Sequence, residues 1–146
     1  MKETTTMGTW TSVSKLTVVL ETGQHQGALF GGQIGVVISI QPTDDTGNAV
    51  TVTTDDLYSK VLLIDFVDAS PIPEKEKTTL NWCWERDKKF KPTPGMTPQI
   101  KYTVEHADSN PDRRVRSFGV RVDLPNGNTL YSSQNGTYQS SVQVEA

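Results

Sequence analysis

Residues 34–41, IGVVISIQ, carry an aliphatic side chain at every even-numbered position. Successive side chains of an extended strand point to opposite faces, so these aliphatic groups share one face. Gly35, Ser39 and Gln41 fall on the other face. An alternation of this kind is typical of a β-strand with one buried side and one side toward water. This stretch is the clearest strand signal in the chain.

The same two-residue period recurs along the chain in short segments that turn residues separate. It is present in residues 15–21, 61–67, 79–85, 99–105, 116–124 and 138–145, with a further short strand expected over 49–53. Turn chemistry is concentrated at residues 44–48 (DDTGN), 110–111 (NP), 125–128 (PNGN) and 135–136 (NG). Residues 54–57 (TDDL) predict at most one short helical turn, ending at residue 60.

Strands of this length, with a turn about every ten to fifteen residues, predict an all-β fold of about eight or nine strands. We expect a single antiparallel two-sheet β-sandwich, because polar residues take the alternate positions of nearly every strand and would cover the outer faces. A closed barrel of similar size would show the same pattern and remains an alternative. The 146 residues fit one domain over 1–146, with residues 1–12 as a candidate flexible arm.

The PNGN segment is the strongest hairpin signal, because Asn and Gly both tolerate the positive φ that tight hairpin turns require. A two-residue loop would place Val122 opposite Tyr131, which the Asn-Gly statistics favour. A three-residue loop with a bulge would place Leu124 opposite Leu130, which the hydrophobic match favours slightly. Both registers stay open at this point.

Composition and charge exclude several classes of protein. The net charge is −3 and the isoelectric point is about 5.3, which argues against a general nucleic-acid binder. The single cysteine, Cys83, allows neither an internal disulfide nor a paired-cysteine zinc site. The glycine-rich residues 31–35 lead into a strand and not into a helix N-terminus, so no phosphate cradle is expected. We expect no cofactor.

Residues 1–7 lack the apolar segment of a signal peptide, and no stretch approaches the roughly 18 apolar residues of a membrane span. We therefore expect no membrane span. The compartment is left open between the cytoplasm and release by a route that needs no signal peptide.

Few residues in the chain offer catalytic chemistry. His25 and His106 are the two histidines, and neither accompanies a serine or cysteine nucleophile motif. Asp65 and Asp68 are candidates for the paired carboxylates of a glycosidase. Asp65, however, points away from the face that residues 62, 64 and 66 share, which indicates a solvated or edge position. We expect no enzyme, and a small hydrolase built on these groups is the second alternative.

Asp44, Asp45 and Asn48 are a weak candidate for a calcium site, because their side-chain oxygens are the ligands that Ca²⁺ prefers. Their spacing does not match the twelve-residue helix–loop–helix calcium motif. Acidic and amide side chains also form turns without any metal. We therefore expect no metal site.

Trp82 and Trp84 share one face of a predicted strand. If they are exposed, they form a platform for sugar rings, together with Trp10. If they are buried, they fill the core, as large aromatic residues commonly do. Leu80 continues the same face, which favours the core.

Arg113, Arg114 and Arg116 are candidates for contact with an anionic partner. They could form a basic rim together with Lys88, Lys89 and Lys91. The alternative interpretation is a solvated turn and strand edge.

Residues 36–40 (VVISI), the turn at 44–48, residues 50–52 (VTV) and the ending at 131–144 together resemble bacterial immunoglobulin-like sandwich domains. Such domains often belong to surface, secreted or toxin-associated proteins. The Cys–Trp–Cys arrangement of true immunoglobulin domains is missing here. The resemblance implies adhesion, recognition or spacing, and it brings no catalytic residues.

We therefore expect a non-enzymatic recognition or assembly module. It would bind a protein or cell-surface partner through loops or a sheet edge. A carbohydrate-binding module that uses exposed tryptophans is the first alternative. The identity of the partner, whether protein or glycan, and the oligomeric state are not readable from the sequence.

Overall fold

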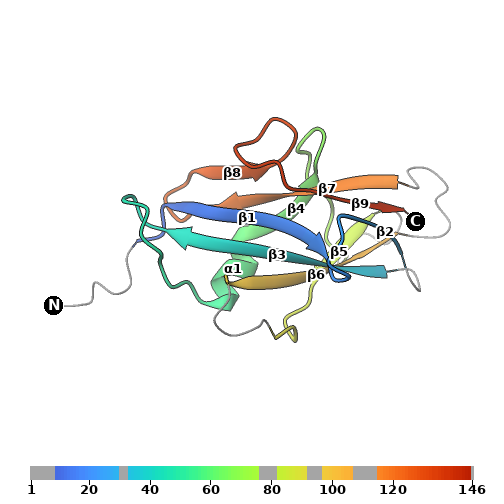
Figure 1. Cartoon of the computed structure of the whole chain (residues 1–146), viewed down its shortest axis with the longest axis horizontal. Coiled ribbons are helices and arrows are strands. Elements are labelled where there is room, and N and C mark those ends of the chain that lie inside the picture. The colour runs from blue at the N-terminus through green and yellow to red at the C-terminus, as the bar shows by residue number, and fades with distance from the viewer. Residues whose placement is uncertain (1–8, 30–32, 76–81, 92–96, 107–114, 146) are drawn as a thin grey trace.

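The computed structural model of the chain describes residues 9–29, 33–75, 82–91, 97–106 and 115–145. Within these ranges the chain forms nine strands and one short helix, and the strands make two sheets (Figure 1). The prediction of a mostly β chain with about eight or nine strands is confirmed.

One sheet has four strands in the order β1-β3-β6-β5, and all its pairs are antiparallel. Its strands are β1 (Ser12–Leu20), β3 (Gln33–Thr43), β5 (Cys83–Arg86) and β6 (Gln99–Glu105). Residues 34–41 lie in β3, between β1 and β6. Val36, Ile38 and Ile40 have no exposed surface, so the even-numbered positions face inward as expected.

The other sheet has five strands, and it is not wholly antiparallel as predicted. Its strands are β2 (Gln26–Ala28), β4 (Val61–Asp65), β7 (Val115–Asp123), β8 (Thr129–Ser132) and β9 (Val142–Glu145). The order is β2-β9-β7-β4, and β8 also pairs with β7. The pair β2–β9 is parallel. These two strands lie far apart in the sequence, so no local turn sets their relative direction.

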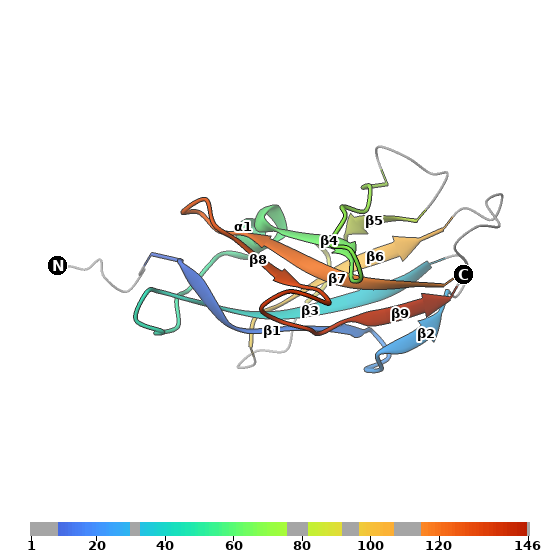
Figure 2. The same ribbon diagram turned by 90° about the horizontal axis from the view of Figure 1, so that it is seen from above.

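The inward faces of both sheets share one hydrophobic core. The four-stranded sheet and its flank contribute Leu16, Val18, Leu20, Ile34, Val36, Ile38, Ile40, Trp82, Trp84, Ile100, Tyr102 and Val104, and the five-stranded sheet contributes Val61, Leu63, Phe118, Val120, Val122, Val142 and Val144. The rings of Trp82 and Phe118 meet edge to face with their centroids 5.4 Å apart. In Figure 1, β1 and β3 lie in front of β4 and β7, and Figure 2 shows this arrangement from above.

The PNGN hairpin has the three-residue loop of one alternative but a different register. Gly127, with a φ of 91°, takes the left-handed position that the bulge requires. Val122 lies opposite Leu130, so the predicted pairs of Val122 with Tyr131 and of Leu124 with Leu130 are both wrong. Leu130 pairs with Val122 and not with Leu124, a shift of two residues. Because side chains alternate between faces with a period of two, each side chain keeps its expected face.

The predicted helical turn is α1 (Thr54–Lys60), which is capped one residue earlier than expected. The Thr53 hydroxyl accepts the Asp56 backbone N–H at 3.2 Å. Residues 49–53 form no strand beyond one bridge at Ala49. α1 is seven residues long, and no helix in the described ranges has the length and apolar content to cross a membrane.

The predicted flexible arm over residues 1–12 is wrong for its last residues. Trp10 is only 5% exposed and belongs to the core, and β1 begins at Ser12. The backbone N–H of Thr11 donates to the Thr43 carbonyl at 2.9 Å, which joins this segment to β3. Residues 1–8 lie outside the described ranges.

A substitution at Gly119 on β7 tests the pairing of β7 with β8 in the five-stranded sheet. A Cβ at this position would lie 2.0 Å from the backbone carbonyl oxygen of Ser132, which cannot move without disturbing the pairing of β7 with β8. We predict that Gly119→Ala lowers the free energy of unfolding by about 2–3 kcal/mol, as overpacked sites do. The measurement is urea unfolding. The control is Ser117→Ala on the same face of β7, for which we expect a change below about 0.5 kcal/mol. An unchanged midpoint for Gly119→Ala would contradict the β7–β8 pairing.

Candidate functional site

The structure brings together three residues that the sequence singled out, where β4 ends and β7 begins. Asp65, Asp68 and Arg116 line one hollow of about 340 Å³, which Val67 and Val115 also line. Asp65 is the last residue of β4 and Arg116 is the second residue of β7. The two strands pair antiparallel, so the end of one lies beside the start of the other.

Asp65 is buried, with 6% of its surface exposed, so the predicted solvated position is wrong, whereas the alternative of an edge position is correct because β4 is an edge strand of its sheet. It lies opposite Phe118, a core residue, and opposite residues of an antiparallel pair share a face. Its side chain therefore starts on the inward face of the sheet. Residues 61–64 are apolar at every position, so alternation could not show which face of this strand is inward.

Arg116 supplies the counter-charge that makes this burial tolerable. Its Nε donates to Asp65 Oδ2 at 2.9 Å, and the two side chains are 18% and 9% exposed. A buried carboxylate without a partner is strongly unfavourable. The Arg116 guanidinium is therefore engaged by an internal acid.

The basic rim suggested by the sequence does not form around Arg116 among the described residues. Lys88 and Lys89 line a separate hollow, together with Glu85, Arg86 and Asp87 but not Arg116. Arg113 and Arg114 lie outside the described ranges, so their predicted contact with an anionic partner stays a prediction.

The same carboxylate orders the loop that follows β4. Asp65 Oδ1 accepts the backbone N–H groups of Val67 at 2.8 Å and Asp68 at 3.2 Å. The Asp65 carbonyl accepts the Ala69 N–H, and the Asp65 N–H donates to the Ser70 carbonyl, both at 2.9 Å. Ala69 has a φ of 61°, which is left-handed backbone that alanine rarely adopts. Several hydrogen bonds therefore hold this loop in one strained conformation.

The ordered loop presents a valine to solvent, and a second valine lies nearby. Val67 is 60% exposed and Val115 is 45% exposed, and they are the exposed large hydrophobic residues of the described chain. Both line the hollow beside Asp65. A second hollow of about 470 Å³ continues from it along β2 and β9, and the two hollows share Val115 and Gln143. The surface is thus apolar at two points and polar around them.

Asp68 adds a fixed negative charge to this surface. It is exposed, and hydrogen bonds from the Ser70 side chain and backbone lower its pKa. The nearby charge of Arg116 lowers the Asp68 pKa further. Asp68 therefore stays ionised at neutral pH.

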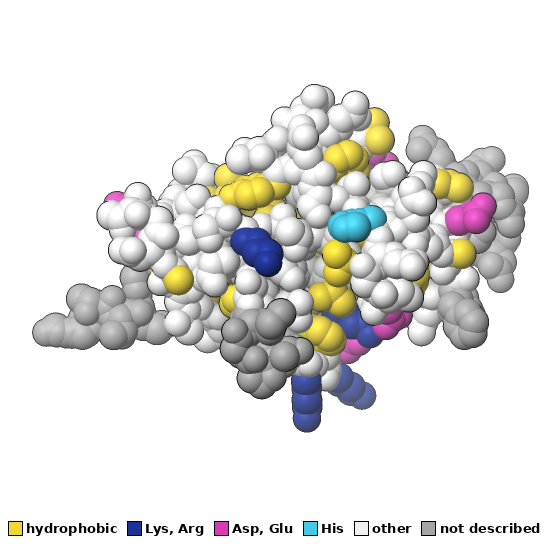
Figure 3. Space-filling model, in the orientation of Figure 1, with side chains coloured by type: hydrophobic (Ala, Val, Ile, Leu, Met, Phe, Trp, Pro, Cys, Tyr) yellow, Lys and Arg dark blue, Asp and Glu magenta, His cyan; other side chains and the backbone are white. Residues whose placement is uncertain are grey.

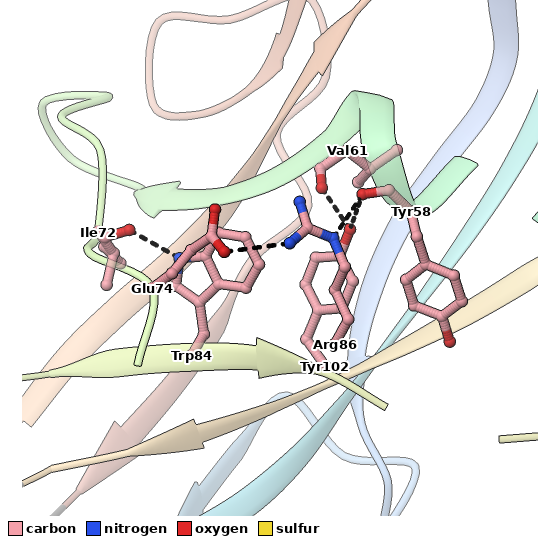
Figure 4. Close-up of polar contacts among 7 residues, drawn as sticks. All are labelled: Tyr58, Val61, Ile72, Glu74, Trp84, Arg86 and Tyr102. Carbon is pink, nitrogen blue, oxygen red and sulfur yellow. Dashed lines mark hydrogen bonds and ion pairs between the residues drawn. The ribbon is translucent and has the colours of Figure 1, made fainter. Parts of the chain in front are cut away.

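Trp82 and Trp84 lie in the core, the interpretation that Leu80 favoured, and do not form an exposed platform. They are 1% and 2% exposed, and Trp10 is 5% exposed. The Trp84 ring stacks on Tyr102 with the centroids 5.1 Å apart, and its Nε1 donates to the Ile72 carbonyl at 2.7 Å (Figure 4). Both indole rings are therefore removed from the surface on which a sugar would stack.

A polar cluster that was not predicted from the sequence lies beside Trp84 at the edge of the core (Figure 4). Its members are Tyr58, Glu74, Arg86 and Tyr102. Arg86 Nε donates to the Tyr58 carbonyl at 2.7 Å, and its Nη1 pairs with Glu74 at 3.2 Å. The Arg86 guanidinium also lies 5.0 Å from the centroid of the Trp84 ring. Tyr102 donates its hydroxyl to the carbonyl at the start of β4, and burial raises its pKa. Arg86 falls on the same strand face as Trp82 and Trp84. A charged residue at a position that faces the core was therefore the sequence feature that could have revealed this cluster.

Neither histidine lines the hollow that contains Asp65 and Asp68, the carboxylates of the hydrolase alternative. His25 is exposed, and its Nδ1 lies 2.9 Å from the Ser141 carbonyl. His106 is buried, with its ring centroid 4.7 Å from that of Trp82. The Asp65 carboxylate is occupied by Arg116 and by backbone N–H groups. The geometry thus assigns Asp65 a structural role.

The calcium candidate is a self-contained turn. Asp44 Oδ1 accepts the Thr46 hydroxyl at 2.7 Å and the N–H groups of Thr46 and Asn48 at 2.9 Å. The Asn48 side chain donates to the Thr46 hydroxyl at 2.9 Å, and Asp45 is exposed. No group of three or more His, Cys, Asp or Glu side chains that could hold a metal occurs in the described ranges. Turn formation accounts for these residues.

The burial of the tryptophans predicts a specific fluorescence behaviour. Intrinsic emission of the folded protein should be blue-shifted, resist quenching by acrylamide and stay unchanged when glucose or cellobiose is added, because Trp10, Trp82 and Trp84 have almost no exposed surface. The same protein in concentrated urea is the control and should show red-shifted, readily quenched emission. Emission that changes with sugar concentration would contradict this prediction.

The Asp65–Arg116 pair predicts strong energetic coupling. Arg116→Met should lower the free energy of unfolding by about 3 kcal/mol, because it leaves a buried carboxylate without its partner. In the double variant Asp65→Asn/Arg116→Met that charge is gone, so the loss should be smaller than the sum of the two single losses by at least about 1 kcal/mol. Urea unfolding of the four proteins measures this coupling. Additive losses would show that the two side chains do not interact.

Comparisons with protein-family models, with curated proteins and with solved structures found no match to this chain. The resemblance to bacterial immunoglobulin-like domains therefore stays a prediction, and the surface of the protein itself carries the functional inference.

Proposed function

We propose that this chain is a non-enzymatic recognition module of the immunoglobulin-like sandwich type. It binds a protein partner through the surface around Val67 and Val115, which we name the valine surface. One observation carries the proposal: the two exposed large hydrophobic residues of the described chain line the same hollow. Single exposed apolar residues are ordinary, but apolar groups that gather within a polar rim are typical of interaction sites.

The order of the loop supports the same function. Asp65 holds the Val67 loop through two backbone N–H groups, and Arg116 holds Asp65. A loop that is already fixed loses little conformational freedom when a partner binds, so more of the contact energy appears as affinity. Loops on a rigid β-scaffold commonly carry recognition for this reason.

Contact through loops is favoured over strand addition, because other parts of the chain already cover two sheet edges. The segment from Ser70 to Lys75 passes from the edge of β4 to the edge of β5. At β4 the Asp65 N–H donates to the Ser70 carbonyl at 2.9 Å, and at β5 the Lys75 N–H donates to the Trp84 carbonyl at 2.8 Å. A covered edge offers fewer free backbone groups to an added strand.

The edge of β1 is also in contact with another segment. The Val18 N–H donates to the Ser140 hydroxyl at 2.8 Å, and the Tyr138 hydroxyl donates to the Val13 carbonyl. Strand addition at β1 would have to displace these contacts. The burial of all three tryptophans likewise counts against the glycan alternative.

Peptide selection tests the proposal. A phage-displayed random-peptide library is selected against the immobilised full chain, and the enriched peptides are synthesised. We expect them to lose about tenfold or more in affinity for Val67→Ser/Val115→Ser, since two exposed apolar contacts are removed. Both positions are exposed, so the unfolding midpoint should stay nearly unchanged.

The matched control is Ala49→Ser, an exposed apolar residue in another loop. Peptides should bind this variant as they bind the wild-type protein. If selection yields no peptides, or if the peptides bind Val67→Ser/Val115→Ser with undiminished affinity, the valine surface is not the recognition site.

A further inference from the structure

We infer that the segment of the partner that contacts the valine surface is cationic as well as aliphatic. It would be an extended stretch that presents Val, Leu or Ile side chains together with Lys or Arg side chains on one face. This inference rests on the proposed function and specifies the chemistry of the partner.

The two hollows form one continuous surface on the outer face of the five-stranded sheet. They share Val115 on β7 and Gln143 on β9. Opposite residues of β7 and β9 place Val115 beside Glu145, and Ser117 beside Gln143. Position 115 therefore lies between a hollow that contains Asp68 and a hollow that contains Glu145.

The charge of this surface is negative among the described residues. Its acidic members are Asp65, Asp68 and Glu145, and its one cation is Arg116. The Arg116 guanidinium is already paired with Asp65, with Nε and Oδ2 2.9 Å apart in a largely buried pair. Asp68 and Glu145 are exposed, and hydrogen bonds from Ser70 keep the pKa of Asp68 low. Two exposed carboxylates therefore flank the exposed valines.

Figure 3 draws one face of the molecule with its side chains coloured by type. On the face drawn, yellow apolar and magenta acidic side chains lie close together at the right-hand end, toward the end of β9. The dark blue cationic side chains lie over the middle and the lower part. Other acidic side chains on this face lie at the lower edge, beside cationic ones, and at the left-hand end.

A cationic, aliphatic strand satisfies both features at once. Its aliphatic side chains would cover Val67 and Val115, and its ammonium or guanidinium groups would reach Asp68 and Glu145. Complementary rim charges mainly raise the association rate and the specificity, and they weaken as salt screens them. A second copy of this chain fits poorly, because a two-fold contact through this surface would bring like carboxylates together.

Two synthetic peptides of equal length, in which aliphatic and charged residues share each face of an extended chain, test the inference: acetyl-LKKVLKKV-amide and acetyl-LEEVLEEV-amide. Binding to ¹⁵N-labelled full-length protein is followed by NMR titration. At low salt we expect the lysine peptide to bind at least about tenfold more tightly than the glutamate peptide, with the largest shifts at Val67 and Val115, and this preference should shrink at high salt. Equal binding, tighter binding of the glutamate peptide, or no binding of either would overturn the inference.

Neutral isosteres locate the charges responsible. Asp68→Asn/Glu145→Gln should weaken binding of the lysine peptide about fivefold, whereas Asp45→Asn, an exposed acid in another turn, should leave it unchanged. The Asp68 carboxylate accepts the Ser70 N–H, and the side-chain carbonyl of the asparagine that replaces it can still do so, which means that the loop should keep its fold. If the affinity of the lysine peptide survives Asp68→Asn/Glu145→Gln, these carboxylates do not select the partner.

Arg113 and Arg114 precede Val115 in the sequence, so their contribution is measured with Arg113→Ser/Arg114→Ser. We expect this variant to bind the lysine peptide at least as tightly as the wild-type protein. If the glutamate peptide binds the wild-type protein and loses affinity in this variant, the partner is acidic and the inference is wrong. The proposed function is judged separately, by whether library-selected peptides need Val67 and Val115.

Discussion

A carboxylate buried on the inward face of a sheet has to be satisfied, and the Asp65 carboxylate determines how this end of the molecule is built. Its oxygens accept the Arg116 guanidinium and the N–H groups of Val67 and Asp68. A buried charge without such partners would destabilise the fold by several kcal/mol. The hydrogen bonds that satisfy Asp65 also shape the next loop and join β4 to the start of β7. Stability of the core and presentation of Val67 therefore depend on the same contacts.

The strand at the edge of the other sheet ends in a comparable way. Asp65 is the last residue of β4, and Arg86 is the last residue of β5. Arg86 also lies on an inward face, since it is opposite Tyr102, and its partners are Glu74 and the Tyr58 carbonyl. Asp65 and Arg86 each lie at the end of an edge strand, and each pairs with a charged residue from another part of the chain. Such pairs can specify where a strand ends, which an apolar residue at that position would not do.

The sequence predicts a strand's faces well only where polar residues mark the outer one. In β3 the polar positions Ser39 and Gln41 identify the outer face, and the inward face is predicted correctly. The expectation that the outer face is toward water is wrong, because most of that face, Ser39 included, is also buried. Residues 61–64 are apolar throughout, so the inward position of Asp65 could not be read from alternation. The parallel pairing of β2 with β9 and the meeting of Asp65 with Arg116 depend on contacts between distant segments. The sequence therefore identified Asp65, Asp68 and Arg116 as chemically active groups, while their proximity and their roles came from strand pairing.

The conformation of Ala69 links this ion pair to recognition. A left-handed alanine costs about 1 kcal/mol or more, and a glycine would avoid that strain. A glycine would also give the free loop more conformations, and their loss would weaken any binding that requires one of them. With alanine, the hydrogen bonds of Asp65 compensate the strain when the protein folds, before any partner is present. A surface with only two exposed valines has little binding energy available for ordering a loop, so fixing the loop at the folding stage favours measurable affinity.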